Sequence, residues 1–113
     1  MTPLQSWLFL TAAIVCEVAA TTCMKLSDSL TRWVWIGPML VGYVLALGGL
    51  ALALKNIEVG IAYAVWAGAG TLVIALIGIA FFGEGASALK LASMALVILG
   101  VVGLNLADVL SRP

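Results

Sequence analysis

The sequence predicts an all-α membrane protein with four transmembrane helices. Of its 113 residues, 65% are hydrophobic and only 9% are charged, and the mean hydropathy is +1.26. A chain of this composition cannot present a polar surface to water. Its apolar residues form four long runs, about residues 4–24, 34–54, 59–82 and 88–107, each long enough to cross a bilayer as a helix. We therefore expect one transmembrane domain over residues 1–113.

The charges and the cysteines exclude several classes of function. Five basic and five acidic residues give a net charge of zero, which argues against nucleic acid as a partner. Cys16 and Cys23 stand seven residues apart on one expected helix, about 10 Å along its axis, which is beyond disulfide reach. The chain has no histidine to complete a metal site. With no nucleophile beside a base, we expect no enzyme, and we expect no metal and no cofactor.

The first span carries a single carboxylate at membrane depth. Residues 4–24 are otherwise uncharged, so Glu17 lies among residues that belong in lipid. An acid at this depth costs several kcal/mol when ionised, and it usually faces a protein interior or a wet cavity on an ion or substrate path. The alternative is a structural acid held by hydrogen bonds. Ala13, Ala20 and Thr21 share the face of Glu17, at i−4, i+3 and i+4, and leave room for a cavity beside it.

The second span follows a polar connection over residues 25–32, and two interfacial tryptophans, Trp33 and Trp35, stand at its start. It carries Tyr43 and ends before a tight turn at residues 55–58. The N-terminus has neither a basic region nor a cleavage site, so we expect the first span to be a retained helix and not a signal peptide.

The third span combines aromatic side chains with glycines. Tyr63, Trp66 and Gly70 lie at i, i+3 and i+7, on one helix face. Trp66 is about seven residues inside the span, too deep for the headgroup layer, which favours a place beside an interior site. Gly68 and Gly70 would let the helix bend or let another backbone approach. The alternative is ordinary aromatic packing between helices.

The fourth span carries Ser93 and Gly100, seven residues apart on one stripe. Small residues let membrane helices approach closely, because lipid supplies no hydrophobic drive for their association. We interpret the stripe as a dimer contact, with packing inside one subunit as the alternative.

The basic residues do not fix an orientation in the membrane. Lys25, Arg32 and Lys90 lie on one expected side, and Lys55 and Arg112 on the other. A difference of one residue is too small to set the topology, so we expect the chain to insert both ways round. An antiparallel homodimer would then supply the two inverted repeats that alternating access requires.

Three motifs make the sequence similar to the small multidrug resistance transporters over essentially its whole length. They are Cys-Glu-Val-Ala-Ala-Thr-Thr at residues 16–22 with Met24-Lys25, Gly-Ile-Ala-Tyr-Ala-Val-Trp at residues 60–66 with Gly68 and Gly70, and Phe-Phe-Gly at residues 81–83. The resemblance implies a dual-topology, antiparallel dimer of four-helix subunits in a bacterial inner membrane. It also implies the exchange of protons for hydrophobic cations.

The resemblance also implies roles for individual residues. Glu17 matches the carboxylate that protons and substrate share in the family. The aromatic lining would be formed by Tyr43, Tyr63 and Trp66, and the small residues beside the glutamate by Ala13, Ala20 and Thr21.

The sequence departs from the family pattern at two positions. Glu58 stands where members often have a proline, and Ser93 stands where the fourth-helix stripe usually has a glycine. Ala20 occupies the place of a tryptophan that is usual in the guanidinium-exporting branch, and the two threonines after it resemble the branch that exports quaternary and polyaromatic cations. A heterodimeric polyamine exporter is a further alternative, since Asp28 and Glu58 are compatible with such members.

The residues themselves predict exchange between protons and lipophilic cations. A carboxyl group withdrawn from water favours its neutral form, whereas a bound cation favours the carboxylate, so the two ligands compete for Glu17. Desolvated contacts with Trp66, Tyr63 and Tyr43 would contribute about 0.5–2 kcal/mol each to binding a lipophilic cation. The rival interpretations are a guanidinium or polyamine exporter, and a structural membrane subunit in which Glu17 pairs with a partner's base.

Overall fold

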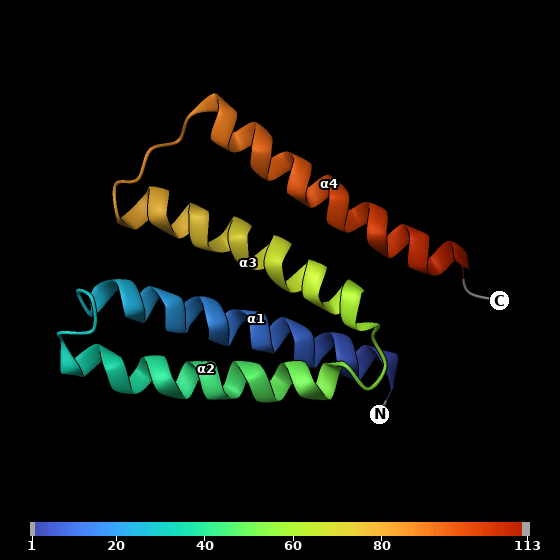
Figure 1. Ribbon diagram of the computed structural model, residues 1–113, viewed down its shortest axis with the longest axis horizontal. Coiled ribbons are helices and arrows are strands. Elements are labelled where there is room, and N and C mark those ends of the chain that lie inside the picture. Colours follow the sequence, from blue (N-terminus) through green and yellow to red (C-terminus); the bar gives the residue numbers. More distant parts are fainter. Residues whose placement is uncertain (1, 112–113) are drawn as a thin grey trace. The chain divides into compact units, whose positions relative to one another are not determined.

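The computed structural model describes residues 2–111 and consists of four helices joined by short connections (Figure 1). They are α1 (Pro3–Leu26), α2 (Trp33–Ala53), α3 (Val59–Phe81) and α4 (Ala88–Ser111). Each is long and apolar enough to cross a membrane, and the described residues contain no strand. Even α2, with 21 residues, spans about 32 Å, against a hydrocarbon core of about 30 Å. The predicted fold class, an all-α protein with four membrane-spanning helices, is confirmed.

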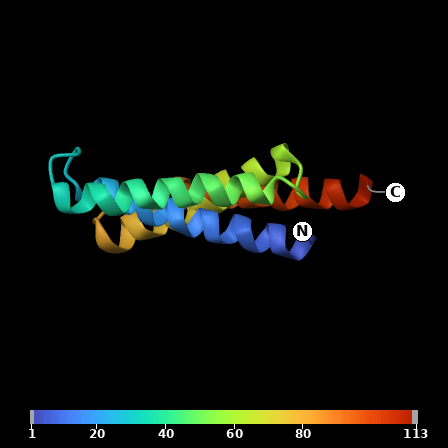
Figure 2. The same ribbon diagram turned by 90° about the horizontal axis from the view of Figure 1, so that it is seen from below.

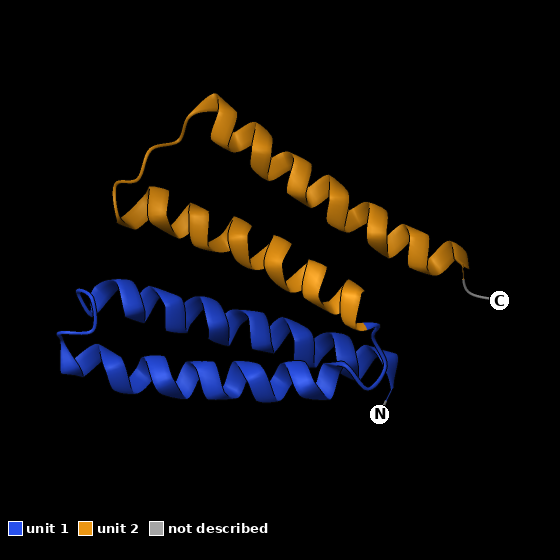
Figure 3. Cartoon of the chain, viewed as in Figure 1, with its two compact units in different colours: residues 1–58 blue, residues 59–113 orange. Residues whose placement is uncertain are grey.

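The chain divides into two compact units, residues 1–58 and residues 59–113 (Figure 3). The first contains α1 and α2, and the second contains α3 and α4. The expectation of one transmembrane domain stays a prediction. Arg112, one of the five basic residues, lies outside the described residues.

The sequence at the start of α1 satisfies the backbone donors of its first turn. The N–H of Gln5 donates to the Thr2 hydroxyl at 3.2 Å, and the N–H of Thr2 donates to the Gln5 side-chain carbonyl at 3.0 Å. Pro3 occupies the first turn, where its missing N–H costs nothing. This reciprocal capping box starts the helix one residue before the apolar run.

The connection from α1 to α2 is a left-handed turn built on Ser27. Residues 28–30 have φ angles of 50°, 60° and 68°, which is unfavourable for a side chain as large as that of Leu30. The fully buried Ser27 hydroxyl donates to the Met24 carbonyl at 2.6 Å and accepts from the Leu30 N–H at 3.0 Å. The N–H groups of residues 31–32 both donate to the Ser27 carbonyl at 2.9 Å. These bonds hold the unfavourable backbone in place.

Two pairs of small residues let α1 and α2 pack closely. Figure 2 shows the two helices alongside each other, and they run antiparallel. A Cβ atom on Gly42 would lie 2.9 Å from the Cβ of Ala20, and one on Gly49 would lie 3.0 Å from the Cβ of Ala13. Both alanines are 1% exposed. Because the pairs repeat every seven residues on both helices, they form one continuous contact face.

In the second unit, α3 contacts α4 through Gly68, where a Cβ atom would lie 2.5 Å from Cγ2 of Val101. The helix α3 is continuous through Gly68 and Gly70. It ends at Phe81, and Gly83, two residues later, has a φ of +66°. The N–H of Glu84 then folds back to donate to the Gly78 carbonyl at 3.1 Å.

Candidate functional site

A hydrogen-bonded cluster joins Glu17 and Thr21 of α1 to Tyr43 of α2. The Thr21 hydroxyl donates to Oε1 of Glu17 at 2.9 Å, and it lies 2.8 Å from the Tyr43 hydroxyl. Thr21 reaches Glu17 because residues four apart are neighbours on one helix face. Tyr43 reaches Thr21 from the facing helix, one residue after the Gly42–Ala20 contact that sets the spacing of the helices. All three side chains are partly buried.

The hydrogen atoms of this cluster can be assigned by counting donors. A threonine hydroxyl has one hydrogen, and in the cluster it is donated to Glu17. The Tyr43 hydroxyl must then be the donor in its own contact with Thr21. The chain of donors therefore runs from Tyr43 to Thr21 to the carboxylate, which is the direction that stabilises a negative charge on Glu17.

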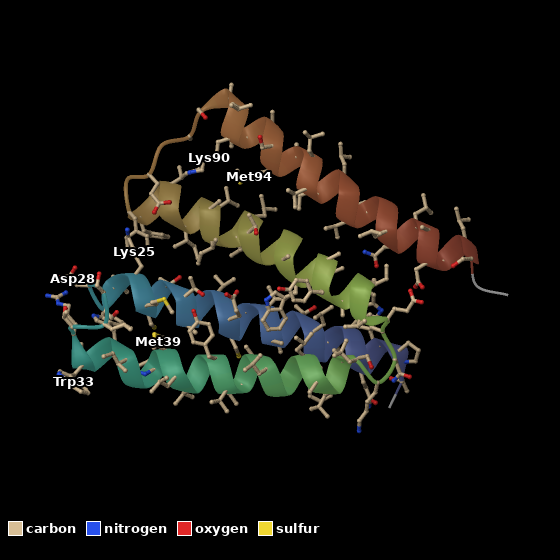
Figure 4. The ribbon with its side chains drawn as sticks, viewed as in Figure 1. Lys25, Asp28, Trp33, Met39, Lys90 and Met94 are labelled. Carbon is tan, nitrogen blue, oxygen red and sulfur yellow. The ribbon has the colours of Figure 1, made fainter. Side chains whose placement is uncertain are left out.

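Two cavities lie in the first unit, and Thr21 of the cluster lines one of them. One, of about 490 Å³, lies where α1 passes into the connection, and Figure 4 shows Lys25 and Asp28 at this end of the helix. It is lined by Thr21, Met24, Lys25, Asp28 and Ser29.

The second cavity, of about 400 Å³, is an apolar groove between α1 and α2. Its lining comprises Phe9, Ala12, Ala13, Cys16, Val44, Leu45, Gly48, Gly49 and Leu52. Cys16, which directly precedes Glu17, is part of this lining. Helix α1, which carries Glu17, thus borders a cavity that includes charged residues toward its C-terminal end and an apolar cavity along its middle.

Of the residues predicted to form the site, the structure brings five together in the first unit. Glu17, Thr21 and Tyr43 form the hydrogen-bonded cluster, and Ala13 and Ala20 lie in the contact between α1 and α2. Ala13 also borders the apolar cavity.

The predicted residues of α3 belong to the second unit, and their part in the site stays a prediction. Tyr63 is 66% exposed. Gly68 packs against Val101 of α4.

The predicted dimer contact on α4 is exposed in the single chain. The Ser93 hydroxyl donates to the Leu89 carbonyl of its own helix at 2.8 Å. A Cβ on Gly100 would meet nothing within 4 Å. No described residue of α4 is buried. Both Ser93 and Gly100 are exposed in the described part of the chain.

Sequence reasoning missed Gly42 and the hydroxyl contact beside it. The signal for the helix contact was present, because Gly42 and Gly49 repeat the seven-residue spacing of Ala13 and Ala20. The contact between Thr21 and Tyr43 depends on the register of the two helices, which a period within one helix does not give. Sequence reasoning also missed Ser6. Its hydroxyl accepts a hydrogen bond from the Asn56 amide at 3.1 Å and so links the start of α1 to the turn after α2.

Comparisons with known proteins place the chain among small membrane proteins of bacteria. The family model described as "Small Multidrug Resistance protein" matches residues 5–97. The uncharacterized membrane protein YvaE of Bacillus subtilis is 44% identical over 104 residues, which are 92% of this chain and 87% of that protein.

Two further relatives have names that refer to quaternary ammonium compounds. The quaternary ammonium compound-resistance protein QacE of Escherichia coli is 42% identical over 103 residues, 91% of this chain and 94% of the relative. The corresponding protein QacF of Klebsiella aerogenes is 43% identical over 108 residues, 96% of this chain and 98% of the relative. These matches extend over nearly the full length of both chains.

Proposed function

The chain belongs to the Small Multidrug Resistance family, and from this premise we propose that it exports quaternary ammonium and polyaromatic cations in exchange for protons. Its four spanning helices and bacterial relatives make it a multi-pass bacterial membrane protein. In the proposed cycle, one site centred on Glu17 binds either a proton or a cation. The names of QacE and QacF, which refer to resistance to quaternary ammonium compounds, support this class of substrate.

The observation that carries the proposal is the isolation of Glu17. No other charged residue stands in the middle of a helix: α2 and α3 have none, and the charged residues of α4 are Lys90 and Asp108, near its two ends. A carboxylate in the middle of a membrane helix is costly unless it has a function or a partner. The bonds from Thr21 and Tyr43 stabilise the charged form with neutral hydroxyls, so the negative charge remains available to a cation.

Competition at a single carboxylate is sufficient for exchange. A bound cation stabilises the carboxylate and disfavours its protonation, and by linkage a bound proton weakens cation binding by the same factor. If the site opens alternately to each side of the membrane, protons entering down their gradient displace cations outward. Neither ligand needs a second binding site.

The aromatic residues support lipophilic cations over hydrated metal ions. Tyr43 belongs to the hydrogen-bonded cluster, and Tyr63 and Trp66 share one face of α3. A desolvated cation over such rings gains about 0.5–2 kcal/mol per contact. Sodium gains less and loses more water. We assign Tyr63 and Trp66 to the substrate lining, and Gly68 and Gly70 to a bend in α3 during the cycle.

An antiparallel homodimer completes the proposal. Helix α4 has no buried described residue, and Gly100 has open space in front of it, which leaves a stripe with Ser93 for a second copy. Because the basic residues favour neither orientation, two copies inserted in opposite directions would form the pair of inverted repeats.

The decisive experiment measures proton release when tetraphenylphosphonium is added to the purified protein in weakly buffered detergent. We expect protons to appear with the native protein and none to appear with Glu17→Gln. Glu58→Gln is the matched control, since Glu58 is exposed in the connection before α3, and it should behave like the native protein.

Other outcomes would redirect the assignment. Binding without proton release, or release that persists in Glu17→Gln, contradicts exchange at this residue. Absence of binding would favour guanidinium, polyamines or a structural subunit, and titration with guanidinium and spermidine separates those cases.

A further inference from the structure

We infer that Thr21 is the positioning residue that sets the pH range of exchange, by linking the Tyr43 hydroxyl to the Glu17 carboxylate in one donor chain. This inference rests on the proposed competition between proton and cation at Glu17. It assigns Tyr43 a task besides aromatic contact with the substrate. It also predicts that a hydroxyl which carries no charge determines how readily a cation displaces the proton.

The hydroxyl of Thr21 behaves differently from its counterparts on the same helix. Thr11 and Thr22 donate to the backbone carbonyls four residues before them, at 2.9 Å and 2.8 Å. This is the usual arrangement of a threonine inside a helix. Thr21 instead donates to a side chain four residues before it, that of Glu17, and contacts α2 through Tyr43. Its hydroxyl is therefore used by the carboxylate and not by the helix backbone.

The donor chain acts differently on the two states of Glu17. When Glu17 is ionised, Thr21 gives its hydrogen to Oε1 and Tyr43 gives its hydrogen to Thr21, so both contacts favour the charge. When Glu17 carries a proton on Oε1, that proton must be donated to Thr21. The Thr21 hydrogen then turns toward the Tyr43 oxygen, and Tyr43 loses its acceptor. Both states contain two hydrogen bonds, but in the carboxylate state the bond to Glu17 is charge-assisted and both hydroxyl hydrogens have an acceptor. A proton on Oε2 instead leaves the chain in place, but Thr21 then donates to a neutral carboxyl oxygen, which is a weaker bond. In either case the cluster stabilises the carboxylate more than the protonated form.

The helices of this unit carry few other titratable or charged side chains that could act on Glu17. Helix α2 has no charged residue, and Tyr43 is its one titratable side chain. On α1 the remaining titratable groups are Cys16, directly before Glu17, and Cys23 and Lys25 toward the C-terminal end. Lys25 and Asp28 line the 490 Å³ cavity together with Thr21. The charges at the C-terminal end of α1 stay the same when Glu17 gains or loses its proton. The hydrogen bonds of Thr21 and Tyr43 change with the protonation of Glu17.

The test compares tetraphenylphosphonium affinity across a range of pH for the native protein and a set of variants. Thr21→Val removes the hydroxyl at nearly constant shape, Thr21→Ser keeps it, and Tyr43→Phe removes only the outer donor. Thr22→Val is the matched control, because the neighbouring hydroxyl bonds the backbone carbonyl of Val18. Each variant is checked for helix content and monodispersity in the same detergent.

We expect Thr21→Val to move the pH midpoint of tetraphenylphosphonium binding to higher pH by about one unit. At neutral pH this is a loss of about tenfold in apparent affinity, which is the order of magnitude that one hydrogen bond to a charged group contributes. At high pH its affinity should equal or exceed that of the native protein. Tyr43→Phe should shift the midpoint by less than Thr21→Val. The double variant, Thr21→Val with Tyr43→Phe, should show the same midpoint as Thr21→Val alone. Thr21→Ser and Thr22→Val should leave the midpoint in place.

The opposite results overturn the inference. A uniform loss at every pH in Thr21→Val assigns Thr21 to packing alone, and an unchanged midpoint removes the donor chain from the mechanism. If Thr21→Val does not fold, the pH midpoint of binding in Tyr43→Phe becomes the test. An unshifted midpoint in that variant contradicts the inference. Glu17→Gln keeps the two proposals apart: if its binding still depends on pH like that of the native protein, the proposed exchange at Glu17 fails whatever the threonine variants do.

Discussion

Gly42 of α2 lies so close to Ala20 of α1 that a Cβ atom on the glycine would stand 2.9 Å from the alanine Cβ and 3.1 Å from the carbonyl oxygen of Cys16. Real Cβ atoms do not approach one another this closely, so the contact requires the hydrogen of glycine. The neighbouring residue on α2 is Tyr43, whose hydroxyl reaches Thr21. The close approach of the helices therefore sets the position of the candidate site.

Substituting Gly42 should separate the two helices. Gly42→Val should lower the free energy of unfolding in mixed detergent micelles by about 1–3 kcal/mol, because the added carbons meet backbone on α1. Gly48→Val is the control, since a Cβ there meets nothing within 4 Å. Equal stability of the two variants would contradict the close contact of Gly42 with Ala20.

A second prediction concerns the contact between α3 and α4. The Cβ introduced by Gly68→Ala would lie 2.5 Å from Cγ2 of Val101, so the substitution should destabilise the protein unless the valine is shortened. Combined with Val101→Ala, it should cost less than the sum of the single changes, with an interaction energy of about 1 kcal/mol. Unfolding of the four species in the same micelles measures this term. Strict additivity would argue against the contact.

The helices could be predicted from the sequence because lipid imposes a simple requirement. An apolar run in a bilayer must satisfy its backbone groups internally, which leaves a helix as the solution for four separate runs. The depth of Glu17 followed from the same runs, since no charge interrupts residues 4–16. These conclusions need no knowledge of which helices touch.

Contacts between helices were harder to predict. Thr21 and Tyr43 are 22 residues apart, and their meeting depends on how far α2 slides along α1. The left-handed turn before α2 was also not foreseen, because a φ of 68° at Leu30 contradicts the local preference of a large side chain. Bonds to Ser27 from both sides of the turn outweigh that preference. Contacts between segments of this kind cannot be predicted from the residue pattern of a single helix or turn.

This turn gives a third prediction. Ser27→Ala removes the hydroxyl that donates to the Met24 carbonyl and accepts from the Leu30 N–H, and leaves both groups to find other partners. The cost should be about 1–3 kcal/mol of unfolding free energy. Ser29→Ala, an exposed change in the same turn, should have little effect. Faster hydrogen exchange at residues 28–31 in Ser27→Ala alone would localise the loss, and identical exchange in both variants would contradict it.

The last prediction separates the membrane carboxylate from the other acids in living cells. Cells that express the native protein should grow at concentrations of a quaternary ammonium compound that stop cells without it. Glu17→Gln should reduce this protection to the level of cells without the protein, because a neutral amide can neither attract the cation nor release a proton. Glu58→Gln should retain protection, since Glu58 is exposed in the connection before α3. Equal membrane levels of the variants, measured by immunoblot, are the control. Protection by Glu17→Gln at the native level would remove the carboxylate from the transport cycle, and loss in both variants would indicate a general requirement for acidic charge.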